Sequence, residues 1–161
     1  MQKARLAVAG IAEDPKFAED FQRMISQYGL TKNTVFLGPQ DKNSIIDLVG
    51  SSRLTIYPST LDTFSLTVLE SLACGTPVIA YNIPAIKYNF GKCKAVLRCP
   101  VKDKTSMAKN VIFLLENEDL RTKLSKEAKK YVSDFDWKKV AKAEKEAYSK
   151  VVEWFNSCPE G

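Results

Sequence analysis

The sequence predicts an α/β fold in which a Rossmann-like, doubly wound parallel sheet has helices on both faces. Short apolar runs alternate with longer stretches of helical periodicity, and glycine or proline separates most of them. The apolar runs are nearly continuous, as expected for strands buried on both faces. At 161 residues the chain has the size of one domain and can bury a sizeable core. We therefore expect residues 1–161 to form a single domain.

Five short apolar segments are expected to form the strands. Each of them is too short to span a membrane. Gly10 and Gly38 follow the first two segments and Pro58 follows the third, which is typical of turns at strand ends. The expected strands are residues 5–9, 34–37, 54–57, 77–80 and 95–98.

Six segments are predicted to be helices because their apolar residues recur every three or four positions. The first helix is amphipathic and ends at Gly29, and Gly75 ends the third. Asp41 is the expected N-cap of the second helix. The expected helices are residues 15–28, 42–50, 64–74, 104–117, 120–133 and 137–155.

The composition excludes several kinds of chemistry. The chain has no histidine, which rules out a histidine metal ligand, a Ser-His-Asp triad and a histidine base within it. The four cysteines form no Cys-x-x-Cys pair. We therefore expect their thiols to be free, and we expect no metal bound by the protein. No secretory leader is evident, so a cytoplasmic location is expected. The net charge of +5 is spread along the chain, which argues against nucleic acid as a partner.

The loop after the third strand, together with the next helix, is the best candidate site. Ligands of doubly wound sheets bind beyond the carboxyl ends of the strands. A helix that begins here would point free amides of Ser65, Leu66 and Thr67 at a phosphate. Glu70 could then accept hydrogen bonds from a ribose diol. Asp62 stands just before this helix. Taken alone, Asp62 and Glu70 have a commoner interpretation, in which Asp62 is only an N-cap and Glu70 is only a solvated helix residue.

Residues 57–80 resemble the donor-site signature of the retaining, GT-B-fold glycosyltransferases of family 4, group 1. The resemblance extends over about residues 5–150 and implies the C-terminal, nucleotide-sugar-binding domain of a two-domain enzyme. The matching positions are Pro58, Ser59, Phe64, Glu70, Ala73, Cys74, Gly75, residues 77–80, residues 35–38, Phe135, Trp137 and Tyr148.

The resemblance implies a role for each matching position. Glu70 would bind the ribose of a nucleoside-diphosphate sugar, and Asp62 would contact the donor sugar as the catalytic residue. Backbone amides at the start of the helix would hold the diphosphate. The loop at Gly10 would border the phosphate, and the residues around Gly38 and Pro39 would flank the base. The binding positions implied in this way are Phe64, Ser65, Leu66, Thr67, Gly10, Gly38 and Pro39. No cofactor other than the donor substrate is implied.

The chain also departs from the family pattern. Asp62 replaces a longer glutamate, and Ser65 replaces a glycine where the backbone meets phosphate. The arginine and lysine that neutralise the diphosphate in this family would lie upstream of residue 1, as would the N-terminal domain that binds a glycan or lipid-linked acceptor. We therefore expect this chain to be inactive alone.

Three alternatives stay open. The first is a non-catalytic nucleotide-binding or scaffold module of the same fold. The second is a nicotinamide-dependent Rossmann protein, which residues 10–14 disfavour because they lack the Gly-x-Gly-x-x-Gly turn. The third concerns location, because the lysine-rich residues 123–145 would allow a peripheral contact at the inner face of a membrane.

Overall fold

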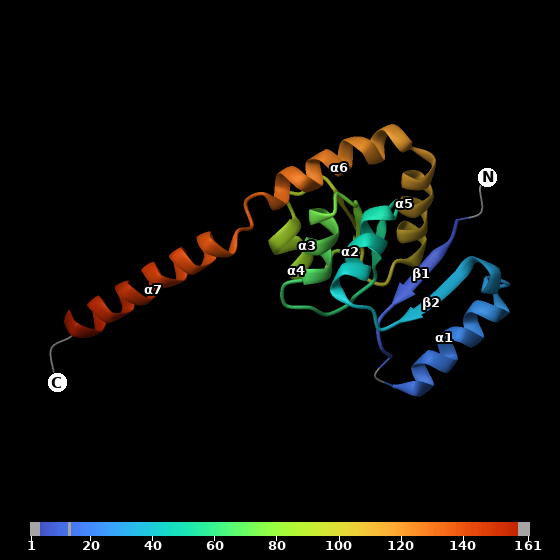
Figure 1. Cartoon of the computed structure of the whole chain (residues 1–161), viewed down its shortest axis with the longest axis horizontal. Helices are drawn as coiled ribbons and strands as arrows, with labels where there is room; N and C mark the ends of the chain where they lie inside the picture. The colour runs from blue at the N-terminus through green and yellow to red at the C-terminus, as the bar shows by residue number, and fades with distance from the viewer. Residues whose placement is uncertain (1–3, 13, 158–161) are drawn as a thin grey trace. The chain divides into compact units, whose positions relative to one another are not determined.

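The computed structural model describes residues 4–12 and 14–157 and contains parallel strands with helices between them, as expected (Figure 1). The chain divides into two compact units, Met1–Ser51 and Ser52–Gly161. Each unit has its own parallel sheet, with strand order β1-β2 in the first unit and β3-β4-β5 in the second. The two units are described in turn.

The first unit is a small β-α-β-α arrangement. Its two strands pair in parallel, with Leu6 opposite Thr34 and an irregularity between Val8 and Ala9. Its elements are β1 (Leu6–Ala9), α1 (Pro15–Gln27), the 3-10 turn η1 (Thr31–Asn33), β2 (Thr34–Gly38) and α2 (Lys42–Ser51).

Local chemistry explains where the helices of the first unit begin and end. One oxygen of the Asp41 carboxylate accepts from the amides of Asn43 at 2.9 Å and Ser44 at 3.1 Å, which confirms the predicted N-cap of α2. After α1, Gly29 has φ +65° and donates its amide to the Ser26 carbonyl. A left-handed glycine is the usual helix stop, so the predicted end of α1 is confirmed.

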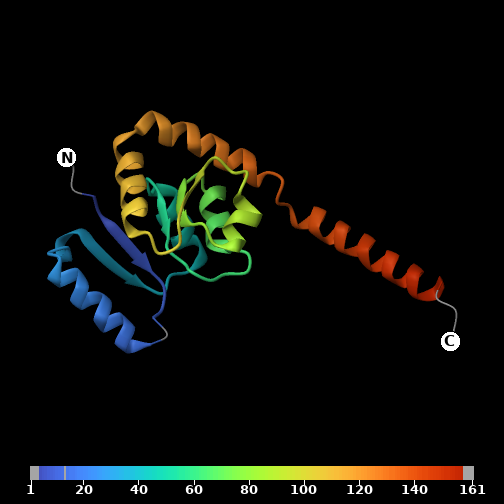
Figure 2. The same ribbon diagram turned by 180° about the vertical axis from the view of Figure 1, so that it is seen from behind.

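The second unit has β4 at the centre of its sheet. All four residues of β4 are buried, because helices cover both faces: α3 lies on one side of the strands and α5 on the other (Figures 1 and 2). The elements are β3 (Thr55–Tyr57), α3 (Leu66–Ala73), β4 (Val78–Tyr81), α4 (Pro84–Phe90), β5 (Val96–Cys99), α5 (Lys104–Glu116), α6 (Glu118–Val132) and α7 (Trp137–Ser157).

Gly75 ends α3, as predicted, and faces α6. This residue has φ +79°, and its amide and that of Thr76 bond back to the carbonyls of Leu72 and Ser71, both at 2.9 Å. These two bonds form a Schellman motif. A Cβ atom on Gly75 would lie 2.6 Å from the Cε atom of the flexible Lys129 side chain on α6, which can move aside, so the positive φ is the stronger reason for glycine here.

The sequence did not predict α4. Pro84 occupies its first turn, where the missing amide costs nothing, and Ala85, Ile86 and Phe90 are buried in the core. The helix has seven residues, too few for a clear helical period. Tertiary burial therefore stabilises α4 more than its local sequence does.

Candidate functional site

The loop of residues 58–65, which we call the donor loop, is organised around the Asp62 carboxylate. Its Oδ1 atom accepts hydrogen bonds from the amides of Thr63 at 2.6 Å and of Phe64 and Ser65, both at 3.2 Å. Its Oδ2 atom accepts a hydrogen bond from the hydroxyl of Tyr57, the last residue of β3. One side chain thus ties the end of β3 to the start of α3.

Electrostatics keep this arrangement in one protonation state at neutral pH. The hydrogen bond from Tyr57 is the largest cause of a lowered pKa for Asp62, and the three loop amides lower that pKa further. Burial, followed by the bond to Asp62, raises the pKa of Tyr57. The phenol therefore stays protonated and donates, while the carboxylate stays charged and accepts.

The helix after the donor loop begins two residues later than predicted. Ser65 has φ +70°, a left-handed conformation that ends the loop, so α3 starts at Leu66. The Ser65 amide, which we expected to be free, donates instead to Asp62. The first intrahelical bond runs from the Val68 amide to the Ser65 carbonyl, so the amides of Leu66 and Thr67 precede the hydrogen-bonded ladder.

Glu70 lies on the same exposed face of α3 as the side chains of Leu66 and Thr67. Val68, Ser71 and Leu72 form the buried side of the helix, whereas Leu66, Thr67 and Glu70 are exposed. Leu66 and Glu70 are four residues apart, about 6 Å along the axis. Helix α3 therefore has amide donors outside the hydrogen-bonded ladder at its start and an exposed carboxylate one turn later.

The first unit brings two other predicted residues together. The Gly10 amide, directly after β1, donates at 2.8 Å to the carbonyl of Gly38, the last residue of β2. Both glycines have positive φ, +136° and +63°, which explains their residue type. Pro39 follows Gly38 and is exposed.

Phe64 contributes its ring to an aromatic cluster within the second unit. Its ring centroid lies 6.0 Å from that of Phe90 and 6.3 Å from that of Phe135. Its carbonyl accepts a hydrogen bond from the side-chain amide of Asn89, at 3.3 Å. Sequence reasoning missed Asn89, because nothing local indicates a partner 25 positions away.

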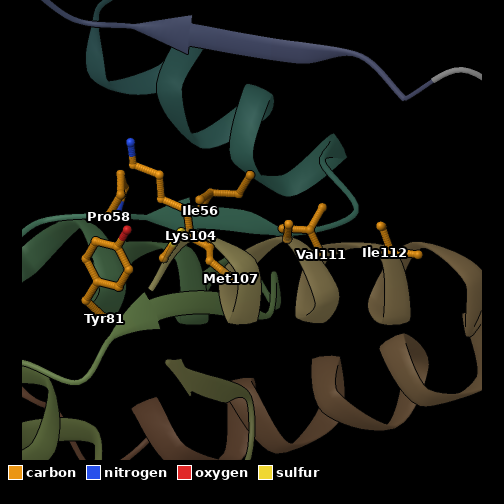
Figure 3. A pocket seen from close by; sticks show the side chains of 8 residues that line it. Ile56, Pro58, Tyr81, Lys104, Met107, Val111 and Ile112 are labelled. Atoms are coloured by element: carbon orange, nitrogen blue, oxygen red, sulfur yellow. The ribbon is translucent and has the colours of Figure 1, made fainter. Parts of the chain in front are cut away.

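An apolar groove of about 490 Å³ lies between the sheet of the second unit and α5 (Figure 3). Tyr81 and Lys104 contribute the polar groups near its wall. None of the predicted donor-site residues is among those that line it, which are Ile56, Pro58, Tyr81, Lys104, Met107, Ala108, Val111 and Ile112.

Cysteine chemistry and metal binding find little support in residues 4–12 and 14–157. In these ranges no three His, Cys, Asp or Glu side chains gather closely enough to hold a metal ion. Burial raises the pKa of the thiols of Cys74, Cys93 and Cys99, which disfavours the reactive thiolate. Cys158 lies outside the described residues.

No helix in the described part of the chain is long and apolar enough to cross a bilayer.

We expect Asp62→Ala to disorder the donor loop without unfolding the protein. The amides of residues 63–65 lose their acceptor, so their NMR signals should shift and their hydrogen exchange should accelerate about tenfold. Asp103 caps α5 in a similar way, through the Ser106 amide at 2.9 Å, so Asp103→Ala is the matched control and should leave the loop signals unchanged. Equal loop spectra for the wild type and Asp62→Ala would contradict this role.

The same loop signals should depend on pH. Because the folded pKa of Asp62 is lowered, its hydrogen bonds are fully present above the unfolded value of about 3.9 and are lost as pH falls through the folded pKa. The amide signals of residues 63–65 should therefore titrate below about pH 4 in the wild type but not in Asp62→Ala.

Comparison with known proteins identifies the family. Residues 1–131 match the sequence profile of the glycosyl transferases group 1. The chain belongs to this family. Among curated group 1 relatives, it is 26% identical over 147 residues to a D-inositol 3-phosphate glycosyltransferase from Corynebacterium urealyticum, a match that covers 91% of this chain and 32% of the relative. It is 29% identical over 129 residues to an N-acetyl-alpha-D-glucosaminyl L-malate synthase from Bacillus anthracis, covering 80% and 32%. The chain thus spans about a third of the length of these relatives.

Solved structures of glycosyltransferases share the fold of this group 1 chain. Anabaena Alr3699/HepE in complex with UDP-glucose matches with a TM-score of 0.84 at 18% identity, covering 93% of this chain and 42% of that one. Sucrose-phosphate synthase from Thermosynechococcus elongatus matches with a TM-score of 0.82 at 21% identity, covering 92% and 39%. These matches confirm the predicted α/β class and the predicted GT-B relationship.

Proposed function

We propose that this chain is the donor-binding part of a retaining glycosyltransferase, which moves a sugar from a nucleoside-diphosphate sugar to a glycan or lipid-linked acceptor. The observation that supports this best is the exposed face of α3. It combines amides outside the helical ladder, at Leu66 and Thr67, with the Glu70 carboxylate one turn away. A helix N-terminus attracts phosphate, and a carboxylate accepts hydrogen bonds from a diol.

In this proposal each group has a separate task. The amides of Leu66 and Thr67 bind the diphosphate, and Glu70 binds both ribose hydroxyls. Asp62 holds the donor loop with Oδ1, while Oδ2 keeps acceptor capacity beside its bond from Tyr57. That remaining capacity suits a hydroxyl of the donor sugar.

The chemistry of transfer requires residues beyond this chain. The chain has no histidine and spans about a third of its relatives, so we place the acceptor site and any histidine base in the remainder of the protein. As the bond between the sugar's anomeric carbon and the acceptor oxygen forms, the bond to the diphosphate breaks, and the α3 amides stabilise part of the charge on the departing nucleoside diphosphate. The chain alone is then a binding domain and is inactive in transfer.

A thermal-shift panel tests nucleotide binding directly. UDP is the first ligand to try, because the similar Anabaena protein was solved with UDP and UDP-glucose. At about 5 mM ligand and a dissociation constant near 1 mM, mass action adds about 1 kcal/mol, a shift of roughly 2–4 °C. GDP and ADP compare the bases, and NAD tests the nicotinamide alternative. Uridine and pyrophosphate at the same concentration separate the two halves of the ligand.

The panel has decisive outcomes. A shift with one nucleoside diphosphate that exceeds those with its nucleoside and with pyrophosphate supports a donor site. A shift with NAD alone would overturn the proposal. Equal shifts with every anion would indicate only nonspecific charge binding.

One observation favours the non-catalytic alternative. The Asp62 carboxylate already accepts four hydrogen bonds within its own unit, three at Oδ1 and one at Oδ2, so only the remaining capacity of Oδ2 is open to a sugar. The two functions differ in one assay. With the full-length protein, nucleotide binding without sugar transfer or donor hydrolysis would favour the binding module.

A further inference from the structure

We propose that Asn89 is a positioning residue that locks the peptide group between Phe64 and Ser65, and that Tyr131 holds Asn89 in place. Neither residue belongs to the donor-site pattern described above. The expected consequence for nucleotide binding rests on the proposed function, whereas the expected consequence for the loop does not.

Two hydrogen bonds connect three segments of the second unit. The Asn89 side-chain amide, on α4, donates to the Phe64 carbonyl in the donor loop at 3.3 Å. The Tyr131 hydroxyl, on α6, donates to the backbone carbonyl of Asn89. These partners lie 25 and 42 positions apart in the sequence, so the folded unit, not the local chain, sets the orientation of Asn89.

The Phe64 carbonyl and the Ser65 amide belong to the same planar peptide group. Asn89 donates to the carbonyl end of this group, and Asp62 accepts from its amide end, at 3.2 Å. The group is therefore held at both ends, on opposite sides. Rotating it would break both bonds at once.

The conformation of Ser65 explains why such a lock is needed. A left-handed conformation such as its φ of +70° is strained for a residue with a Cβ atom and free of that strain for glycine. A rotation of the Phe64–Ser65 peptide would relieve that strain by changing φ of Ser65. It would also turn the Ser65 amide away from Asp62 and release the turn that precedes Leu66, the first residue of α3. Asn89 and Asp62 together oppose this rotation.

The aromatic cluster makes Asn89 and Tyr131 rigid. Phe90, next to Asn89, is fully buried and packs against the ring of Tyr131, with centroids 6.3 Å apart. The ring of Tyr131 also lies 5.6 Å from that of Phe135, which contacts the ring of Phe64. Because these side chains are fixed by packing, the hydrogen bond to the Phe64 carbonyl loses little entropy when it forms.

Asn89→Ala in the full chain tests the lock. We expect the exchange rate of the Ser65 amide, measured by NMR, to rise about tenfold, and the dissociation constant for UDP to rise about tenfold. Asn110→Ala is the matched control, because the Asn110 side chain is also half-buried and donates one hydrogen bond, to the Cys99 sulfur at 3.2 Å. That variant should change neither the Ser65 amide nor UDP binding.

A rescue experiment separates a lock from simple structural support. Ser65→Gly removes the strain at this position, because glycine adopts φ +70° freely. In that background Asn89→Ala should change UDP affinity by only about twofold. A purely structural Asn89 would cause the same loss with either residue at position 65.

The outcomes decide both proposals separately. Unchanged Ser65 exchange in Asn89→Ala would overturn the lock, as would equal effects of Asn89→Ala and Asn110→Ala on the loop. Equal losses of UDP affinity in the serine and glycine backgrounds would also overturn it. If the wild type binds no nucleotide, the proposed function fails, and the exchange comparison alone decides whether Asn89 holds the loop.

Discussion

Phe90→Ala is expected to lower the free energy of unfolding by about 3–5 kcal/mol. The Phe90 side chain is fully buried at the end of α4 and belongs to the core that surrounds β4. Its ring also contacts the rings of Phe64, Tyr131 and Phe135, at centroid distances of 6.0–6.5 Å. Truncation leaves a cavity that these partners cannot fill without leaving their own positions. Urea unfolding followed by circular dichroism measures the loss.

A surface phenylalanine provides the control for this prediction. Phe113 on α5 is 50% exposed, so Phe113→Ala should cost about 1 kcal/mol or less. Similar losses for the two variants would show that the cluster around Phe90 contributes nothing beyond ordinary surface packing. A loss at Phe90 with an unchanged urea slope would confirm that the cavity, not a change in the unfolded chain, is the cause.

The features that the sequence predicted are those set by local chemistry. The Asp41 cap and the Gly29 stop were both expected and both confirmed, because each depends on neighbours within four positions. The strands were predicted nearly to the residue, because glycine or proline bounds most of the short apolar runs; the expected burial on both faces holds for β4, whereas the residues of β1 and β2 are exposed or half-buried. The single-domain prediction stays a prediction, because nothing in the structure tests it.

The features that the sequence missed depend on distant partners. The expected helix start near residue 64 was wrong because Ser65 takes a left-handed conformation that glycine, not serine, normally indicates. The bonds that hold this conformation come in part from Asn89 and Tyr131, in segments far along the chain. Helix α4, which presents Asn89, was itself not predicted. The candidate site was found only through its motif, and its supports required the folded unit.

Glu70→Gln is expected to weaken binding of a nucleoside diphosphate by about 1.5–3 kcal/mol, the usual contribution of a hydrogen bond to a charged group. Glu70 is exposed on α3, so the substitution should leave the fold and the melting temperature unchanged. Isothermal titration calorimetry with UDP measures the loss. Glu116→Gln, at the exposed end of α5, is the control for removing one negative charge and should bind UDP as the wild type does.

The ribose assignment for Glu70 is tested by removing the hydroxyls as well as the carboxylate. If Glu70 accepts hydrogen bonds from the ribose hydroxyls, the wild type should bind 2′-deoxy-UDP more weakly than UDP. Glu70→Gln should bind the two nucleotides with more similar affinities. The two changes then remove one interaction, so their effects are not additive. Additive effects of the two changes, whatever their sign, would mean that Glu70 does not act on the ribose but elsewhere, for example through its charge near the start of α3. Because a carboxylate disfavours a nearby diphosphate, that alternative predicts tighter UDP binding in Glu70→Gln, and the sign of the change therefore separates the two roles.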